Sequence, residues 1–319
     1  MKPGAVLLLL VGLSFAALAQ TGWVGARRGQ AGKDLNAVFF ADSKRGWIAG
    51  DEGYVSRTED GGHSWAQQNT GIAEAVNDIY FRSKEEGYLL AGDRIYGTGD
   101  GGARWRELTR IPSASVGGGQ PELYSVRFTS KKRGWAVGSV SRRDQVIDSL
   151  LVQTDDGGLT WERQRVPTRS ELIHLDFVND DNGWIVGAGG TILHTSDGGR
   201  SWITQQSTVN GALYHVDFRN NRTGWAVGER GIIIRTTDGG VTWMTANSPV
   251  RVTLLSVAFV DDDEGWIVGR GGIILRSGDG GRTWLQQETG TRQNLYALFI
   301  NKKNGWAVGG DGMVLQYER

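Results

Sequence analysis

Two histidine-aspartate segments in the middle of the chain have the residue types of a metal site. His174-x-Asp176 and His215-x-Asp217 occupy matching positions in neighbouring repeats. Imidazole nitrogens and carboxylate oxygens are common ligands of transition metals. The next repeat has Ser256 and Ala258 at these positions, so the ligand pattern does not continue. We therefore favour a polar lining on two inner strands, and we predict no metal and no other cofactor.

Paired carboxylates would indicate a different chemistry, glycoside hydrolysis, which needs two carboxyl groups about 5 to 10 Å apart. Acidic residues are frequent in the predicted turns, but their spacing singles out no pair; examples are Asp51, Glu52, Asp93, Glu229 and Asp311. We predict no catalytic residue and a protein that is not an enzyme. A carbohydrate-active propeller hydrolase, sialidase-like or glycosidase-like, is the alternative.

Composition excludes two further classes of function. The chain has 35 basic and 35 acidic residues, so its net charge does not indicate binding to a nucleic-acid backbone. It contains no cysteine, which excludes disulfides and thiol chemistry. We expect a protein partner, no nucleic acid, and a monomer.

The N-terminus has the pattern of a secretory signal. An apolar run from Ala5 to Leu18 follows Lys2 and ends in the small-residue sequence before Gln20. It is shorter than the roughly 20 residues of a membrane-spanning helix. We predict a signal peptide at residues 1–19, one domain at residues 20–319 without a membrane segment, and export to the periplasm or the medium.

A repeat organises the rest of the chain. A glycine-aromatic pair occurs seven times, mostly 40 or 41 residues apart, at Gly46-Trp47, Gly87-Tyr88, Gly134-Trp135, Gly183-Trp184, Gly224-Trp225, Gly265-Trp266 and Gly305-Trp306. This period is typical of propeller blades with four short strands. We predict an all-β, seven-bladed β-propeller with four antiparallel strands, A to D, in each blade.

One repeat shows how a blade is built. Leu213–Phe218 alternates as strand A, with Tyr214, Val216 and Phe218 expected on one side. Gly224–Gly228 and Ile232–Thr236 follow as strands B and C, and a turn at Asp238 leads to the outer strand D. The seventh repeat stops after strand C. We predict that the N-terminal residues Trp23–Gly29 supply its strand D, which removes an exposed edge.

A second motif recurs in step with the first. It reads Ser/Thr-x-Asp-x-Gly-x-Ser/Thr-Trp and resembles the Asp-box of sialidases, sortilin-type receptors and propeller glycosidases; its aspartates are Asp60, Asp100, Asp156, Asp197, Asp238 and Asp279. Arg104 departs from it at the second Ser/Thr position. We expect a structural role, because six copies spread around a ring cannot all serve one site.

Combined with the Gly-Trp-x-x-Gly strand, the pattern resembles the photosystem II stability and assembly factor family. That resemblance implies a periplasmic or lumenal protein, in the thylakoid lumen if the source is photosynthetic. It also implies the absence of a catalytic centre and binding of a membrane-protein subunit or precursor through an arginine-rich face.

Arg110-Ile111-Pro112 resembles a sialidase element, but it follows two Asp-boxes instead of preceding the first.

Strand topology separates the basic residues. In an antiparallel blade, the B–C turns and D–A connections share one face, whereas the A–B turns and Asp-boxes share the other. The first face carries Lys33 and nine arginines, for which we predict partner binding: Arg94, Arg110, Arg142, Arg143, Arg169, Arg230, Arg251, Arg270 and Arg292. The second carries Lys44, Lys84, Lys131, Lys132, Lys302 and Lys303, with Arg45, Arg133 and Arg222. Arginine suits interfaces because its guanidinium pairs bidentately and stacks on aromatic rings.

An insertion interrupts the period in the third repeat. We expect residues Ser139–Ser149 to lengthen its B–C turn on the arginine-bearing face, where the Arg142-Arg143-Asp144 tip could reach a partner.

Overall fold

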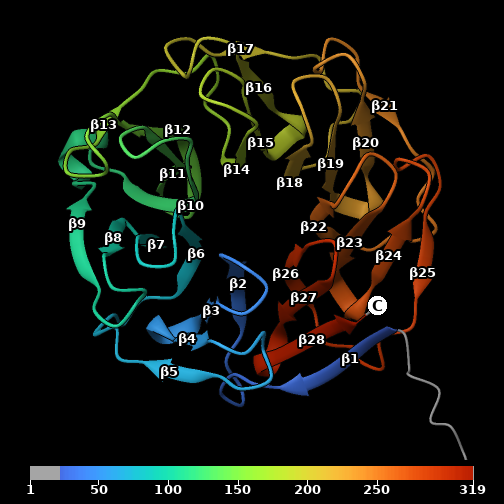
Figure 1. Ribbon diagram of the computed structural model, residues 1–319. Helices are drawn as coiled ribbons and strands as arrows, with labels where there is room; N and C mark the ends of the chain where they lie inside the picture. Colours follow the sequence, from blue (N-terminus) through green and yellow to red (C-terminus); the bar gives the residue numbers. More distant parts are fainter. Residues whose placement is uncertain (1–21, 319) are drawn as a thin grey trace, which may run out of the picture.

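Seven four-stranded antiparallel sheets surround a central channel in the computed structural model, which describes residues 22–318 (Figure 1). The predicted seven-bladed β-propeller is thereby confirmed. The predicted signal peptide at residues 1–19 lies outside the described residues. Within residues 22–318, no helix is long and apolar enough to cross a membrane.

Strands A to D run from the channel outward in each blade. Blade one comprises β2 (Leu35–Phe40), β3 (Gly46–Gly50), β4 (Val55–Thr58) and β5 (Ala66–Gln68); blade two comprises β6 (Val76–Phe81), β7 (Gly87–Ala91), β8 (Arg94–Thr98) and β9 (Arg106–Arg110). Blade three has β10 (Gln120–Phe128), β11 (Gly134–Arg142), β12 (Gln145–Thr154) and β13 (Glu162–Arg163); blade four has β14 (Leu172–Phe177), β15 (Gly183–Gly187), β16 (Ile192–Thr195) and β17 (Ile203–Thr204).

The remaining blades follow the same order. Blade five has β18 (Leu213–Phe218), β19 (Gly224–Gly228), β20 (Ile233–Thr236) and β21 (Met244–Thr245); blade six has β22 (Leu254–Phe259), β23 (Gly265–Gly269), β24 (Ile274–Ser277) and β25 (Leu285–Gln287). Blade seven has β26 (Leu295–Ile300), β27 (Asn304–Gly309), β28 (Met313–Glu318) and β1 (Gly22–Arg27). Short 3₁₀ turns are η1 (Asp51–Gly53), η2 (Ser113–Val116), η3 (Ala188–Gly190), η4 (Glu229–Gly231), η5 (Arg270–Gly272) and η6 (Gly310–Gly312).

Blade seven is closed by both ends of the described chain. β1 pairs antiparallel with β28, from Gly22 opposite Glu318 to Arg27 opposite Met313. The buried ring of Trp23 packs against Tyr317, with 5.3 Å between the ring centroids. The predicted closure by the N-terminal strand is therefore correct, although the strand is Gly22–Arg27 and not Trp23–Gly29.

The core lies between the blades and depends on the Gly-Trp strands. β19 and its counterpart β23 are buried along their whole length because each middle strand packs against neighbouring blades on both faces. The indole of Trp225 stacks on Phe259 of the next blade, with 3.5 Å between ring centroids. Trp184 stacks on Phe218 at the same distance.

Trp266 is buried like these tryptophans, but its surroundings differ. The seven Gly-aromatic pairs predict equivalent environments for Trp184, Trp225 and Trp266, and for Trp266 this prediction is wrong. Trp184 and Trp225 each stack on the phenylalanine at the end of strand A in the next blade. The corresponding residue next to Trp266 is Ile300 in β26, which lies opposite Gly305 as Phe259 lies opposite Gly265. The aromatic neighbour of Trp266 is instead Tyr317, at a tilted 5.7 Å.

Candidate functional site

The turns divide between two faces as the topology requires. Backbone hydrogen bonds join the B–C turns to the connections that enter strand A, for example Glu229 N–H to the Ala212 carbonyl and Arg270 N–H to that of Thr253, each 3.0 Å. On the opposite face, the Asp-box glycine Gly61 donates to the carbonyl of Lys44 in an A–B turn at 2.8 Å. We call the first surface the arginine face and the second the Asp-box face.

The nine predicted arginines all lie on the arginine face, but they are not equally free. Arg94 pairs with Glu74 and Glu107, and Arg110 pairs with Asp93 at 2.8 Å. Arg142 is exposed and donates to the carbonyl of Gly117. The remaining arginines are exposed and form no ion pair with another described residue: Arg143, Arg169, Arg230, Arg251, Arg270 and Arg292. The lysine on this face, Lys33, pairs with Glu52.

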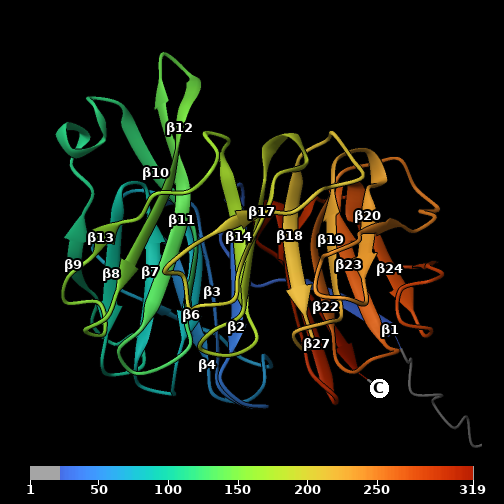
Figure 2. The same cartoon turned by 90° about the horizontal axis from the view of Figure 1, so that it is seen from above.

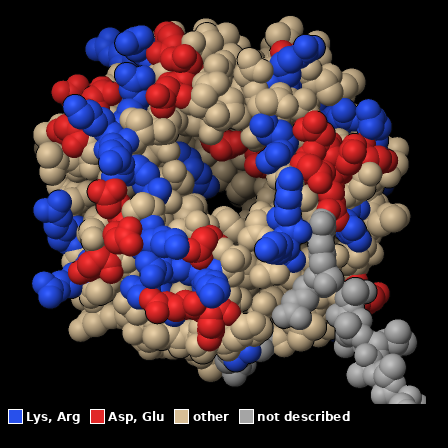
Figure 3. Space-filling model, viewed as in Figure 1, with Lys and Arg blue, Asp and Glu red and all other residues tan. Residues whose placement is uncertain are grey.

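The Asp-box face mixes both charges (Figure 3). Lys84 there pairs with Asp42 at 2.7 Å, and Arg45 lies within 4 Å of both Glu59 and Glu85. Basic side chains on this face are thus partly neutralised by acidic neighbours.

Blade three rises above the other turns of the arginine face (Figure 2). Its insertion lengthens the B–C connection, and it does so as a hairpin, because the residues extend β11 and β12 to a tight turn. Arg143 and Asp144 form this turn with positive φ angles of 50° and 61°. The preceding segment with η2 supports the hairpin, since Arg142 contacts Gly117 there. Sequence analysis did not identify that supporting segment.

The Asp-boxes are hydrogen-bonded turns. In blade four, Asp197 accepts bonds from the hydroxyls of Thr195 at 2.8 Å and Ser201 at 2.6 Å. These donors, with the Ser201 hydroxyl first, lower the pKa of Asp197 to about 2. Asp100 lacks the second hydroxyl because Arg104 replaces the Ser/Thr residue. Backbone N–H donation by Arg104, then the Thr98 hydroxyl, lowers its pKa.

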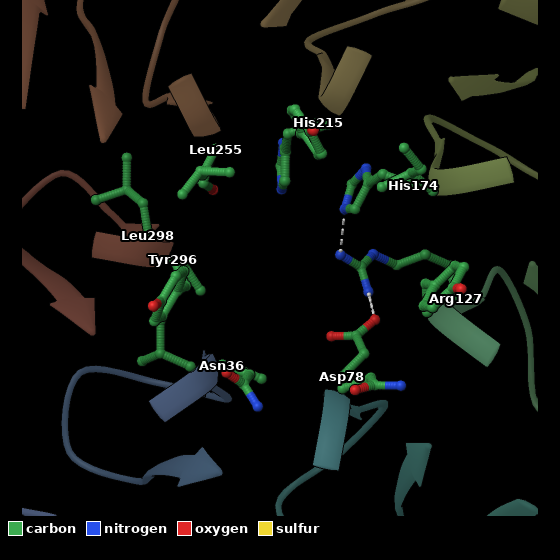
Figure 4. Close-up of a pocket in the computed structure, with 16 residues that line it drawn as sticks. Asn36, Asp78, Arg127, His174, His215, Leu255, Tyr296 and Leu298 are labelled. Carbon is green, nitrogen blue, oxygen red and sulfur yellow. Dashed lines mark hydrogen bonds and ion pairs between the residues drawn. The ribbon is translucent and has the colours of Figure 1, made fainter. Parts of the chain in front are cut away.

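A cavity of about 390 Å³ lies at the end of the channel next to the arginine face. Its lining comes largely from the first residues of the inner strands, and these strands begin at the arginine face. Arg127 of β10 extends across it (Figure 4). Its guanidinium donates to Asp78 of β6 at 2.9 Å and contacts Nε2 of His174 in β14 at 3.0 Å. A chain of polar contacts thereby crosses from blade two to blade four.

The two His-x-Asp segments meet at this cavity and link successive blades. The rings of His174 and His215 stack with 3.7 Å between centroids. Asp176 accepts the backbone N–H of Phe218 at 2.8 Å, and Asp217 accepts that of Phe259 at 2.9 Å. The expected polar lining describes the histidines, which line the cavity; the aspartates instead bind the backbone of the next blade.

Burial controls the ionisation of these groups. Loss of water lowers the pKa of His215 to about 3, helped by the charge of Arg127. Burial, then the nearby Asp176 carboxylate, raises the pKa of Asp217 to about 7. Residues 22–318 contain no group of three or more His, Asp or Glu side chains arranged to hold a metal ion.

Comparison with known proteins identifies relatives of the chain. The model of the family described as photosynthesis system II assembly factor YCF48 matches residues 114–207, 201–288 and 247–318, together more than half of the chain. The photosystem II stability/assembly factor HCF136 of Arabidopsis thaliana is 25% identical over 138 residues, which are 42% of this chain and 31% of that protein. The photosystem II assembly lipoprotein Ycf48 of Synechococcus sp. (strain CC9902) is 26% identical over 152 residues, 46% of this chain and 41% of the relative.

The matched segments therefore span less than half the length of either relative. A solved structure of YCF48 bound to D1 peptide covers 98% of this chain and all of its own, with a TM-score of 0.76 and 21% identity. At that identity, the structural match supports the fold.

Proposed function

The chain belongs to the photosynthesis system II assembly factor YCF48 family, and from this premise we propose that it is a non-enzymatic assembly factor that binds a segment of a membrane protein on its arginine face. The observation that carries the proposal is a set of exposed arginines on one face that form no ion pair with another residue of the described chain. The solved YCF48 structure contains a bound D1 peptide, which supports a protein segment as the ligand.

The physical basis is the difference between the two faces. An exposed arginine without a partner keeps its planar set of donors available for carboxylates and backbone carbonyls. On the Asp-box face Lys84 is paired with Asp42. The other lysines there form no ion pair within the described chain, but a lysine ammonium cannot pair bidentately as a guanidinium does. We therefore assign acidic or extended segments of a partner to the arginine face.

We also propose that the protein works outside the cytoplasm. The predicted signal peptide supports export, and one relative is named as chloroplastic and another as a lipoprotein. In a photosynthetic source the compartment would be the thylakoid lumen; in other bacteria it would be the periplasm. Fractionation of cells that express the full chain tests this assignment.

A pair of matched variants tests the binding face. Replacement of Arg142, Arg143, Arg230 and Arg270 by Ala should weaken binding of a fluorescent D1 peptide by at least about tenfold, since interface arginines often contribute more than about 1 kcal/mol each. The control replaces Lys131, Lys132, Lys302 and Lys303 by Ala and should bind as the unmodified protein does. Loss of binding in the lysine variant alone would assign the function to the Asp-box face.

A further inference from the structure

The channel cavity has one apolar side and one polar side. Leu255, Leu298 and Tyr296, from blades six and seven, lie opposite Asp78, Arg127 and His174, from blades two to four (Figure 4). Such a division suits a ligand that has an apolar body and a polar end, and it fits neither a fully charged nor a fully apolar molecule.

Two polar groups of the cavity have no partner. Within the described chain, Nδ1 of His215 and Oγ of Ser256 make no hydrogen bond, and both atoms are shielded from solvent. Ser256 is only 1% exposed, and a buried polar group without a hydrogen bond is costly. The imidazole of His215 nevertheless lines the cavity, so its other nitrogen, Nε2, is the atom that a ligand hydroxyl can approach.

The charge of the cavity argues for a neutral ligand. Among the described lining residues Arg127 is the one basic side chain, and Asp78 neutralises it at 2.9 Å. His215 is neutral because burial keeps its pKa far below the ordinary value. Burial raises the pKa of the nearby Asp176 and Asp217, and neither group supplies the positive charge that would hold a carboxylate.

The cavity adjoins the arginine face. Its lining includes the second residue of several inner strands, such as Tyr214 and Tyr296, where the chain enters from the arginine-face connections. Burial raises the pKa of both tyrosines, and the positive charge of Arg270, an exposed arginine of that face, acts in the opposite direction. A segment bound across the face could therefore insert one side chain into the cavity.

We propose that this cavity receives a tyrosine side chain of the partner segment; the inference rests on the binding function proposed above. The ring would pack on Leu255 and Leu298, and the hydroxyl would reach Nε2 of His215. About 390 Å³ is enough for one such side chain. Aromatic anchors that fill a pocket at the centre of an interface are typical binding hot spots.

The first test uses a small phenol and the four histidines of the chain. Titration with p-cresol should shift the imidazole NMR signals of His174 and His215, whereas those of His63 and His194, outside the cavity, should stay unchanged. Toluene, which lacks the hydroxyl, should bind at least about fivefold more weakly. Equal binding of both compounds, or no shift with p-cresol, would overturn the proposed chemistry.

The second test identifies the source of the phenol. Three acidic peptides that differ only in a central Tyr, Phe or Ala are titrated against the protein. We expect the Tyr peptide to bind at least about tenfold more tightly than the Ala peptide, with the Phe peptide between them. Equal affinities would refute the tyrosine anchor. If p-cresol bound nevertheless, the cavity would be assigned to a free phenolic compound.

Two variants separate this inference from the binding function. Ala297→Met, inside the cavity, should abolish the preference for Tyr without preventing binding of the Ala peptide to the arginine face. Ala66→Met, on the exposed outer strand β5, is the matched control and should preserve the preference. The two proposals can fail separately. If the arginine variant lost all peptide binding while the unmodified protein showed no preference for Tyr, the arginine face would stand as the binding site and the tyrosine anchor would be refuted.

Discussion

The indole nitrogen of Trp225 donates a hydrogen bond to the carbonyl oxygen of Gly280, 3.1 Å away in the Asp-box of the next blade. Trp47 binds Gly101 and Trp184 binds Gly239 in the same way. The Gly-Trp strand of one blade is therefore joined to the Asp-box of the following one, which explains why both motifs recur with one period.

Trp225→Phe should lower the free energy of unfolding by about 1 to 3 kcal/mol, because the buried carbonyl of Gly280 loses its donor. Trp225→Ala should cost about 3 to 5 kcal/mol, since the stacking on Phe259 is also lost. Urea unfolding measures both. Trp266→Phe is the control: its indole nitrogen has no acceptor within residues 22–318, so its loss should be smaller. Equal losses at both positions would contradict this account.

Arg104→Thr should restore a complete Asp-box in blade two. The new hydroxyl would donate to Asp100 as the Thr160 hydroxyl donates to Asp156 at 2.6 Å in blade three. We expect a gain of a few tenths to about 1 kcal/mol at this exposed turn, and a pKa of Asp100 close to the value of about 2 for Asp156. NMR titration of the carboxyl carbon measures the pKa. Arg104→Ala, which removes the arginine without adding a hydroxyl, should give no comparable shift.

Asp217→Asn should alter the pH dependence of stability. The pKa of Asp217 is about 7 when folded and about 3.9 when unfolded. Between these values the folded protein holds a proton that the unfolded chain releases, so this group lowers stability as pH rises from about 4 to 7. The variant removes this loss, and its amide oxygen can still accept the N–H of Phe259.

We therefore expect the variant to gain stability relative to the unmodified protein as pH rises, by at most about 1.4 kcal/mol per pH unit. Chemical denaturation at pH 5, 6, 7 and 8 measures this difference. Asp263→Asn, at an exposed turn of the Asp-box face, is the control. A difference that does not change with pH would show that Asp217 is ionised throughout.

Removal of residues 20–29 should markedly lower the melting temperature, because β28 would lose its partner β1 and the ring of Trp23 would leave the core. Val24→Ala, at a side chain that is 56% exposed in the same strand, is the control and should change little. An unchanged transition after the deletion would show that closure by β1 contributes nothing to stability.

The repeat made the fold predictable because each blade carries the same sequence motifs. Strands A and B of blade five, for example, were predicted with their observed bounds, Leu213–Phe218 and Gly224–Gly228. The sides of the sheet to which the side chains of strand A point were not predicted correctly. A β-bulge between Leu213 and His215 interrupts the alternation, so Tyr214 and His215 both line the cavity instead of lying on opposite sides.

The site itself was only partly predictable. Turn topology alone sufficed to place the nine arginines on one face. Whether each is free depends on acidic neighbours distant in sequence, such as Glu74 beside Arg94. Arg127 gave no signal of its own, because its contacts with Asp78 and His174 join three blades across the channel.

The pairing of β1 with β28 also dictates when the molecule can finish folding. Gly22 and Glu318 face each other from opposite ends of the described chain, so the ring has an extreme sequence separation at its seam. Such long-range pairings form slowly because much chain entropy must be lost before the pairing stabilises the fold. Blades one to six can form without β28, whereas β1 has no partner until β28 is in place. Until then the unpaired edge of β1 and the incomplete seventh blade are exposed to aggregation.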